Sequence, residues 1–114
     1  MAALSLEIEN PISERYEELC PVAKTAAVIG SKWTLLVIRD LAGGKKRFSQ
    51  LERSLRGISA KTLSERLRGL EHECIVNRRA YAEIPPRVEY ALTEKGQALL
   101  TLIESMREYG ERWL

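Results

Sequence analysis

The chain has 114 residues and a formal net charge of +2, with 45% hydrophobic and 30% charged residues. This length and composition are typical of one globular domain, and they exclude a disordered chain or a protein with two cores. The longest apolar runs, such as 35–38, fall far short of the roughly 20 residues of a membrane helix. Residues 1–10 carry two acidic residues and no basic one, which is not typical of a secretory signal, so we expect a cytoplasmic location.

Charge is distributed unevenly along the chain. Residues 1–20 hold five acidic residues and one basic residue, whereas residues 45–79 hold ten basic residues against four acidic ones. The second segment is a local positive region in a nearly neutral protein, as expected of a surface that faces an anion such as DNA. A solvated basic surface without a partner is the alternative, and the order of the predicted elements favours DNA.

The first part of the chain predicts two helices and a short link. Pro21 suits the first residue of a helix that Gly30 ends. Ser31 can cap a second helix, which ends at Gly43-Gly44. The basic link 45–48 that follows has room for one brief strand.

The middle of the chain predicts two more helices and a hairpin. A short third helix covers 49–55, and a fourth begins at Ser59 and runs to about 73. Two β-type segments follow, 75–82 and 88–92, and the proline-bearing residues between them form the turn. Thr93 then caps a long final helix.

The predicted fourth helix has one apolar and one polar face. At about 100° per residue, Leu67 and Leu70 fall within about 40° of Leu63, which defines the buried side. A helix with a polar outer face fits the major groove, and its first turn points backbone amides at phosphates. An ordinary amphipathic surface helix would show the same pattern. The residues on or beside the outer face are Lys61, Thr62, Ser64, Glu65, Arg68 and His72.

The predicted hairpin carries basic residues as well. Arg87 falls in the turn beside Pro85 and Pro86, and Arg78 and Arg79 lie in the strand that leads there. A turn stiffened by prolines that presents a guanidinium suits contact with the minor groove or with phosphates. The hairpin is therefore expected to act as a wing beside the fourth helix.

Several motifs resemble those of the HxlR-type regulators, relatives of the MarR group. They are Cys20-Pro21-Val22, Ile29-Gly30-Ser31-Lys32-Trp33, Arg47-Phe48-Ser49-Gln50-Leu51, and residues 57–67, 85–90 and 92–96. The resemblance covers roughly residues 20 to 113. It implies a winged-helix homodimer that binds a palindromic promoter site, with the recognition helix at 59–72 and the wing at 81–90. The chain departs from the family at Cys74, where a glycine is usual, so the recognition helix ends on a residue that tolerates a left-handed backbone less well.

The predicted final helix carries a broad apolar stripe. A terminal helix has little of its own chain left to cover in a domain this small, so a wide stripe favours contact with a second copy. The alternative is that the helix simply closes its own core. The residues expected in the dimer interface are Leu102, Met106, Tyr109 and Trp113.

Cys20 is the candidate sensing residue. It immediately precedes Pro21, at the expected N-cap of the first helix, where amide dipoles favour a thiolate. Oxidant-sensing members of the family that the chain resembles use a cysteine at this position. Glu17 and Glu18 oppose ionisation, so a structural cysteine stays as the alternative, and a bound small molecule is a further trigger to consider.

No catalytic pattern is present in the sequence. His72 is the single histidine, and neither a glycine-rich phosphate loop nor an evident pair of catalytic carboxylates accompanies it. His72 and Cys74 are too few ligands for a closed zinc site. We therefore expect no enzyme activity, no cofactor and no metal.

These observations predict one mainly α domain over 1–114 with a small β-hairpin wing, a winged helix-turn-helix. Its parts are an N-terminal arm at 1–19, the helix-turn-helix at about 32–73, the wing at about 75–92 and a dimerisation helix at about 94–113, and its N- and C-terminal helices form a dimer interface. We expect a transcription regulator that binds double-stranded promoter DNA as a homodimer and responds to an oxidant or small-molecule effector. The alternative is a winged-helix module for protein–protein interaction, without sequence-specific DNA binding. The expected DNA contacts are Arg47, Ser49, Gln50, Ser59, Lys61, Thr62, Ser64, Glu65, Arg68 and Arg87.

Overall fold

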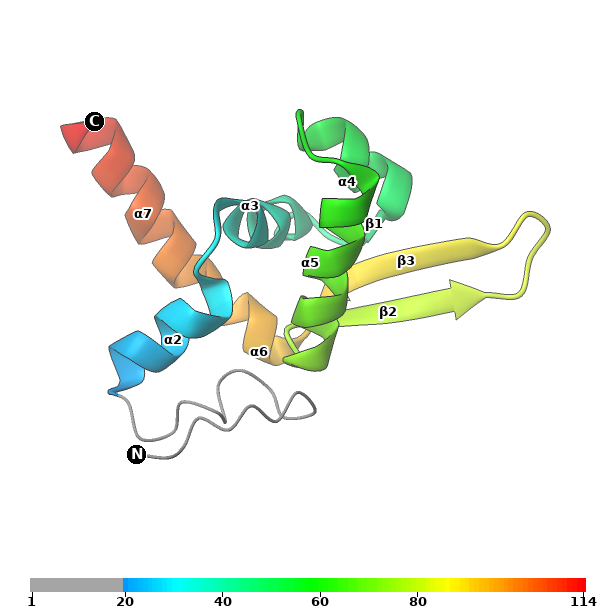
Figure 1. Cartoon of the computed structure of the whole chain (residues 1–114), viewed down its shortest axis with the longest axis horizontal. Helices are drawn as coiled ribbons and strands as arrows, with labels where there is room; N and C mark the ends of the chain where they lie inside the picture. Colours follow the sequence, from blue (N-terminus) through cyan, green and yellow to red (C-terminus); the bar gives the residue numbers. More distant parts are fainter. Residues whose placement is uncertain (1–19) are drawn as a thin grey trace.

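The computed structural model describes residues 20–114, and the arm predicted over 1–19 lies outside the described residues. The chain forms helices with a small sheet between them (Figure 1), which confirms the predicted fold class. In chain order the elements are α2 (Pro21–Ile29), α3 (Lys32–Leu41), β1 (Lys46–Arg47), α4 (Phe48–Ser54), α5 (Ala60–His72), β2 (Val76–Tyr81), β3 (Arg87–Leu92), α6 (Glu94–Gln97) and α7 (Leu100–Trp113).

Helices α2, α3, α5 and α6 begin where the sequence predicts, because side chains cap their first turns, whereas α4 begins at Phe48, one residue before its predicted start. Ser31 Oγ accepts the backbone N–H of Thr34 at 3.2 Å, which starts α3. Thr93 Oγ1 accepts the N–H of Gly96 at 3.0 Å, which starts α6. Each cap satisfies a donor that the helix itself leaves unpaired.

The sheet has three antiparallel strands in the order β1-β3-β2. The brief strand expected in the basic link is β1, whose Lys46 lies opposite Tyr90 of β3. The β2–β3 hairpin extends away from the helices (Figure 1), and its register runs from Val76 opposite Leu92 to Tyr81 opposite Arg87. Arg87 is therefore the first residue of β3, so its expected place in the turn is wrong. The cause is cross-strand pairing with Tyr81, which lengthens the strand by one residue.

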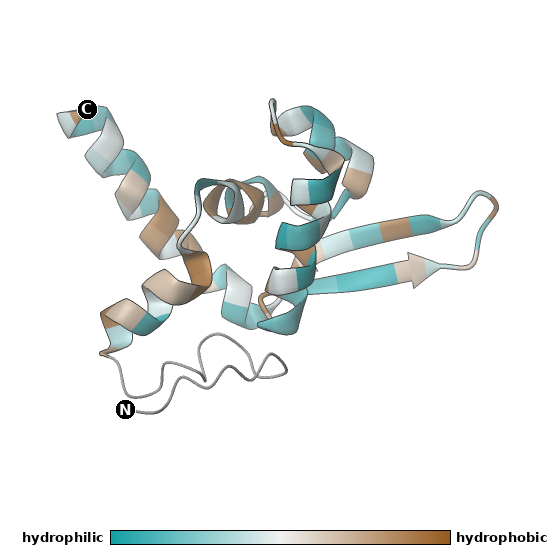
Figure 2. Ribbon diagram, in the orientation of Figure 1, coloured by the Kyte–Doolittle hydropathy of each residue, from teal (hydrophilic) through white to brown (hydrophobic). Residues whose placement is uncertain are grey.

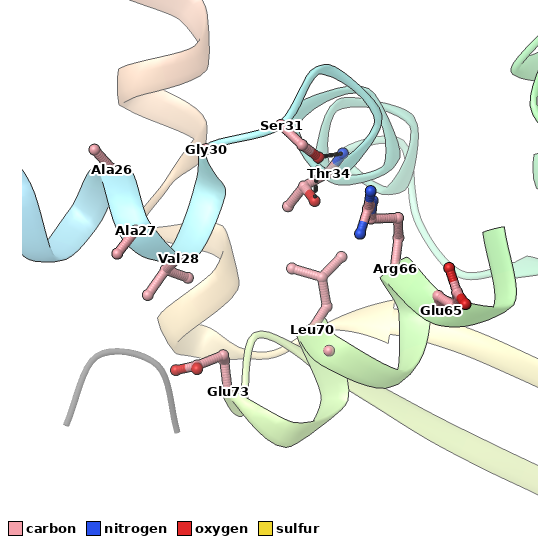
Figure 3. Close-up of a pocket in the computed structure, with 11 residues that line it drawn as sticks. Ala26, Ala27, Val28, Gly30, Ser31, Thr34, Glu65, Arg66, Leu70 and Glu73 are labelled. Carbon is pink, nitrogen blue, oxygen red and sulfur yellow. Dashed lines mark hydrogen bonds between the residues drawn. The ribbon is translucent and has the colours of Figure 1, made fainter. Parts of the chain in front are cut away.

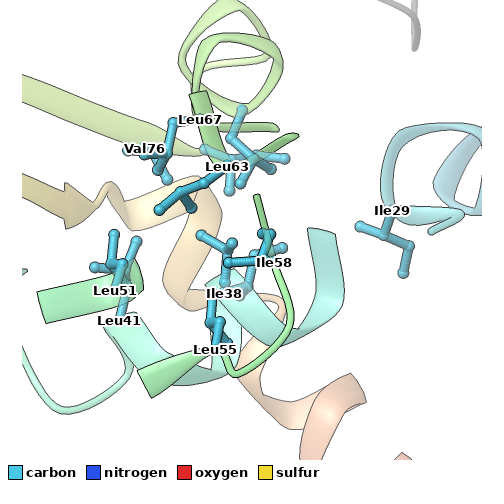
Figure 4. Packing of buried hydrophobic residues seen from close by; sticks show 12 residues of the cluster. Ile29, Ile38, Leu41, Leu51, Leu55, Ile58, Leu63, Leu67 and Val76 are labelled. Carbon is cyan, nitrogen blue, oxygen red and sulfur yellow. The ribbon is translucent and has the colours of Figure 1, made fainter. Parts of the chain in front are cut away.

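The core lies between α3, α4, α5 and the base of the hairpin. Leu63, Leu67 and Leu70 of α5 are buried, as the stripe predicted, and they pack with Val37 and Ile38 of α3. Figure 4 shows this cluster, with Ile29 of α2 lying apart from the rest. Ile29 is the buried residue of α2, so this helix contributes little to the core.

The predicted long final helix is wrong, because the structure breaks it into α6 and α7. Residues 98 and 99 form a tight turn in which the Leu99 N–H donates to the Gly96 carbonyl at 3.0 Å. Gly96 is buried against the start of the hairpin, and a Cβ at this position would lie 2.2 Å from the Ile75 carbonyl oxygen. This close packing fixes α6 on the domain, and α7 leaves it in a different direction (Figure 1).

The end of α5 confirms the expectation about Cys74, whose φ of 64° is left-handed. Cys74 N–H donates to the Glu71 carbonyl at 3.0 Å, and Ile75 N–H donates to the Leu70 carbonyl at 2.9 Å. This pair of hydrogen bonds is the Schellman motif, which glycine usually completes.

The same segment is tied to α6 by side chains. Lys95 Nζ donates to the Glu73 carbonyl at 2.7 Å, and Thr93 Oγ1 donates to the Cys74 carbonyl at 2.6 Å. These bonds satisfy carbonyls that the end of a helix leaves unpaired. They fix the C-terminal end of α5 relative to α6.

Candidate nucleic-acid interface

The outer face of α5 is polar and open to solvent. Lys61, Glu65 and Arg68 are exposed on the side opposite the buried leucines. Neither Lys61 nor Arg68 forms an ion pair with a described residue. Figure 2 shows the contrast between the largely hydrophilic α5 and the hydrophobic α3 against which it packs. Both cations are therefore available to an outside anion.

The first turn of α5 is built by two hydroxyl groups. Ser59 Oγ accepts the N–H of Thr62 at 3.0 Å and donates to Thr62 Oγ1 at the same distance. Thr62 can then donate its own hydroxyl proton outward, toward a phosphate or a base edge. Gly57, with φ of 93°, allows the preceding turn that places Ser59 at the helix start.

The first turn of α4, the first helix of the helix-turn-helix, carries three of the predicted DNA contacts. Gln50 Oε1 accepts the backbone N–H of Arg47 at 2.8 Å, so this side chain caps the helix. Its amide nitrogen keeps two donors for an outside partner. Arg47 and Ser49 are exposed beside it. The structure thus brings the predicted residues of α4 and α5 together within one helix-turn-helix, while Arg87 lies separately on the hairpin.

Arg87 is held by its own hairpin. Its guanidinium pairs with Glu83 at 3.0 Å and with Glu89 at 3.7 Å, and it lies 4.0 Å from the centre of the Tyr81 ring. Lys45 approaches the same Glu89 carboxylate at 3.6 Å. This arrangement differs from the free guanidinium that the sequence led us to expect, because cross-strand pairing places two carboxylates beside Arg87.

These groups change the ionisation of Glu89. Burial by itself raises the pKa of Glu89, but the hydrogen bond from Tyr81 and the charges of Lys45 and Arg87 outweigh it and lower the pKa below its ordinary value. The carboxylate is therefore charged at neutral pH, and it keeps Arg87 in place on the hairpin.

Three exposed arginines extend the positive surface beyond the predicted residues. Arg56 follows α4, and Arg78 and Arg79 lie on β2. Arg79 also lies over the Tyr81 ring at 5.5 Å. The sequence marked all three as members of the basic segment 45–79, and it marked Arg78 and Arg79 also by their place in the predicted hairpin.

A second surface is apolar and involves α2 and α7. The four residues predicted for a dimer interface are 39% to 65% exposed: Leu102, Met106, Tyr109 and Trp113. Val22 of α2 is 77% exposed close to them in the fold, and a groove of about 420 Å³ between the two helices is lined by Val22, Ile29, Leu102 and Met106. No residue of α7 is fully buried within the described chain.

Cys20 occupies the N-cap of α2, as predicted. Its Sγ accepts the N–H of Ala23 at 3.4 Å, and the side chain is exposed. Cys74 is also a free, exposed thiol. Cys20 therefore begins the helix that borders the apolar surface, whereas Cys74 follows α5.

Two further features of residues 20–114 bear on function. No group of three His, Cys, Asp or Glu side chains in this part of the chain is arranged to hold a metal ion. None of its helices alone is long and apolar enough to cross a membrane, and the one stretch that reaches that length and composition, α2 with α3, is bent by 83°.

Known proteins share this sequence and fold. The family model for the HxlR-like helix-turn-helix matches residues 28–114. An uncharacterized HTH-type transcriptional regulator of Synechocystis sp. is 44% identical over 96 residues, covering 84% of this chain and 71% of that protein. A solved structure from Porphyromonas gingivalis W83, described as a MarR-family transcriptional regulator, matches with a TM-score of 0.82 at 37% identity, covering 85% of this chain and 95% of that one. The redox regulator HypR in its oxidized form matches with a TM-score of 0.77 at 42% identity, covering 81% and 95%.

Proposed function

Because the chain belongs to the HxlR-like helix-turn-helix family of transcriptional regulators, we propose that it binds a palindromic promoter site as a homodimer. In this proposal α5 enters the major groove and the β2–β3 hairpin lies alongside as the wing. The observation that carries the proposal is the exposed polar face of α5, on which Lys61 and Arg68 have no partner among the described residues. One helix fills the major groove, and basic side chains there contact guanine edges or phosphates.

The contacts divide into positioning and base reading. We assign phosphate contact to Arg47, Ser49 and Ser59, which lie at the starts of α4 and α5 where backbone amides also point outward. We assign base contact to the outer face of α5 and its flanks, with Gln50 beside it. The residues of that face and its flanks are Lys61, Thr62, Ser64, Glu65 and Arg68.

Arg87 has a separate role on the wing. When Arg87 binds DNA, phosphate oxygens or the minor groove would replace Glu83 and Glu89 as its partners. The net gain in binding free energy is therefore smaller than for an unpaired arginine. We therefore assign Arg87 to general affinity for DNA and not to sequence discrimination.

Dimerisation through α2 and α7 explains the apolar surface. Monomeric proteins rarely expose a continuous apolar patch of this kind, and a two-fold axis lets the same patch cover itself. Light scattering at micromolar concentration should give about twice 13.0 kDa. A stable monomer at that concentration would contradict both the dimer and the palindromic site.

Cys20 is the proposed sensing residue for oxidants or electrophiles. Its exposed thiol lies at the start of α2, beside the proposed interface, so modification there would change how the two protomers meet. The spacing of the two α5 helices must match about one DNA turn, ~34 Å, and a small rotation weakens binding. The similar redox regulator HypR is consistent with this role. If Cys20→Ser leaves the oxidant sensitivity of DNA binding unchanged, the sensing role is wrong.

Footprinting on the DNA upstream of the chain's own gene tests the main proposal. A protected palindrome, competed by the same duplex and much less by random duplex, is the expected result. Equal competition by random duplex would contradict sequence-specific binding. It would favour a winged-helix module whose basic face binds an acidic protein.

A further inference from the structure

Helix α3 has a second apolar stripe besides the one buried in the core. Residues 32, 35, 36 and 39 follow helical spacing on the side of α3 that faces α7, and residues 103, 106 and 107 supply the facing side of α7. Between the two stripes lies a groove of about 400 Å³, the α3–α7 groove. None of these side chains is fully buried, and Met106 is 46% exposed. The apolar residues of the groove are Leu35, Leu36, Ile103 and Met106.

The rim of the α3–α7 groove is positively charged. Lys32, Arg39 and Arg107 line it, and no carboxylate is among the described residues that do. Lys32 is exposed, lies over the Trp33 ring at 4.7 Å and forms no ion pair with a described residue. Arg39 and Arg107 pair with carboxylates of their own helices, and those carboxylates do not line the groove. The groove therefore suits an occupant that is both apolar and acidic.

The sequence of the arm at residues 1–19 has this chemistry. The arm lies outside the described residues, and it holds five acidic residues against one basic residue. Leu4, Leu6 and Ile8 alternate with polar residues, two of which are Glu7 and Glu9. Such alternation is typical of an extended segment with one apolar and one polar side. The HxlR-like family model begins at residue 28, so the arm is not part of the family match.

The arm also ends close to the groove. Pro21, the second residue after the arm, lines the neighbouring groove between α2 and α7, and Met106 lines both grooves. The two grooves therefore adjoin along α7, and a helix with its side chains is only ~10–12 Å wide. An extended chain spans ~3.3 Å per residue, so the residues between Ile8 and Cys20 are more than enough to cross α7.

We propose that the arm of each protomer docks in the α3–α7 groove of the same protomer, with Leu4, Leu6 and Ile8 against its apolar walls. Glu7 and Glu9 then lie near the cations of the rim. No residue of α7 is fully buried within the described chain, so this occupant covers the side of α7 that faces α3 and leaves the α2 side to a second copy. The docked arm thus holds α7 on the domain.

Photocrosslinking of the full chain tests the occupant. Benzoylphenylalanine placed at position 6 should attach on irradiation to residues 32–39 or 103–107, which peptide mass spectrometry identifies. The product should migrate as a single chain on a denaturing gel, because the arm and the groove belong to one protomer. The same group at position 5, on the polar side of the alternation, is the matched control and should attach there at a much lower yield. A product of two chains, attachment only elsewhere, or equal yields from both positions would overturn the proposal.

A charge exchange tests the rim. Lys32→Glu should lower the yield of the position-6 product about two- to fivefold, the effect expected when an exposed ion pair is lost. Adding Glu7→Lys and Glu9→Lys should restore the yield, since the reversed charges attract each other again. Arg53 is exposed at the end of α4, outside the groove, so Arg53→Glu is the control and should leave the yield unchanged. Equal yields from Lys32→Glu and Arg53→Glu would overturn the proposal.

Oxidation of Met106 tests whether the arm covers the groove without a crosslinker. Met1 is the only other methionine, so peptide mass spectrometry assigns the oxidised residue directly. Leu6→Ser combined with Ile8→Ser should speed oxidation of Met106 by hydrogen peroxide severalfold, whereas Ala2→Ser combined with Ala3→Ser should not. Light scattering should give the same mass for both variants. Equal oxidation rates, or a mass that changes with the arm, would overturn the proposal. These measurements need no DNA, so their outcome is independent of the proposed function.

Discussion

Replacing Cys74 with glycine should stabilise the protein. The residue follows α5 at a φ of 64°, where a Cβ crowds the neighbouring carbonyl and costs about 1–2 kcal/mol. Glycine removes that cost, but its greater conformational entropy in the unfolded chain reduces the stability gain by about 0.4–1 kcal/mol. Cys74 is exposed, so its removal loses little burial. The net expectation is a gain of about 1 kcal/mol in the free energy of unfolding.

Thermal and urea unfolding at a fixed protein concentration measure this change. A gain of about 1 kcal/mol corresponds to a rise in Tm of roughly 4–8 °C for a domain of about 100 residues. The concentration is held constant because the Tm of a dimer depends on it. Urea unfolding should show a higher midpoint with an unchanged slope.

Cys74→Ala is the matched control, because it removes the sulfur and keeps the Cβ. Its stability should stay close to that of the original chain. If Cys74→Gly and Cys74→Ala shift the Tm equally, the effect comes from the sulfur and the argument from backbone conformation fails. A loss of stability in the glycine variant would refute it as well.

Three other predictions test the faces of α5, the wing and the packing of α6. Lys61→Ala should weaken binding to the specific duplex more than to random duplex, with little loss of fold, because the proposal assigns this side chain to a base contact. Leu67→Ala should cost ~2–5 kcal/mol in urea unfolding because it opens a core cavity. The reverse pattern would mean that the two faces of α5 are exchanged. Arg87→Ala should weaken binding to specific and random duplex by similar factors, measured by fluorescence anisotropy, and a loss confined to the specific site would show base or shape readout. Gly96→Ala should destabilise the protein by about 1–3 kcal/mol because its Cβ would lie 2.2 Å from a backbone oxygen. Gly69→Ala, in open space within a helix, should stabilise it by up to about 1 kcal/mol. Thermal unfolding that ranks the two variants the other way would contradict the packing of α6.

Features that depend on neighbours in the chain could be predicted from the sequence. Ser31, Ser59 and Thr93 cap the helices that follow them, because capping needs only a side chain three residues before the N–H that it accepts. The buried stripe of α5 follows from helical spacing alone. The left-handed turn at Cys74 was expected from the family pattern, and the φ of 64° confirms it.

Features that depend on tertiary contacts could not be predicted in the same way. The break after α6 arises because Gly96 packs on Ile75, a residue on the far side of the hairpin in sequence. Arg87 meets two carboxylates because the strands pair in one register, which the turn residues alone do not specify. The cavity of about 440 Å³ that Val28 of α2 and Arg66 of α5 line (Figure 3) forms because those two helices lie side by side, and no local pattern in the sequence places them together.

The four-residue helix α6 connects α5, which we assign to DNA, with α7, which we assign to the dimer interface. Lys95 fastens it to the end of α5, and the turn at residues 98 and 99 sets the direction in which α7 leaves. In a two-fold dimer that forms through α7, both protomers have the same angle between α6 and α7. A change in that angle therefore moves both α5 helices and alters the distance between them. One residue inserted at the turn would rotate α7 by about 100° about its axis and carry its apolar stripe off the partner. The length of that turn therefore sets the distance between the two α5 helices of the proposed dimer, although no residue of the turn is assigned to DNA.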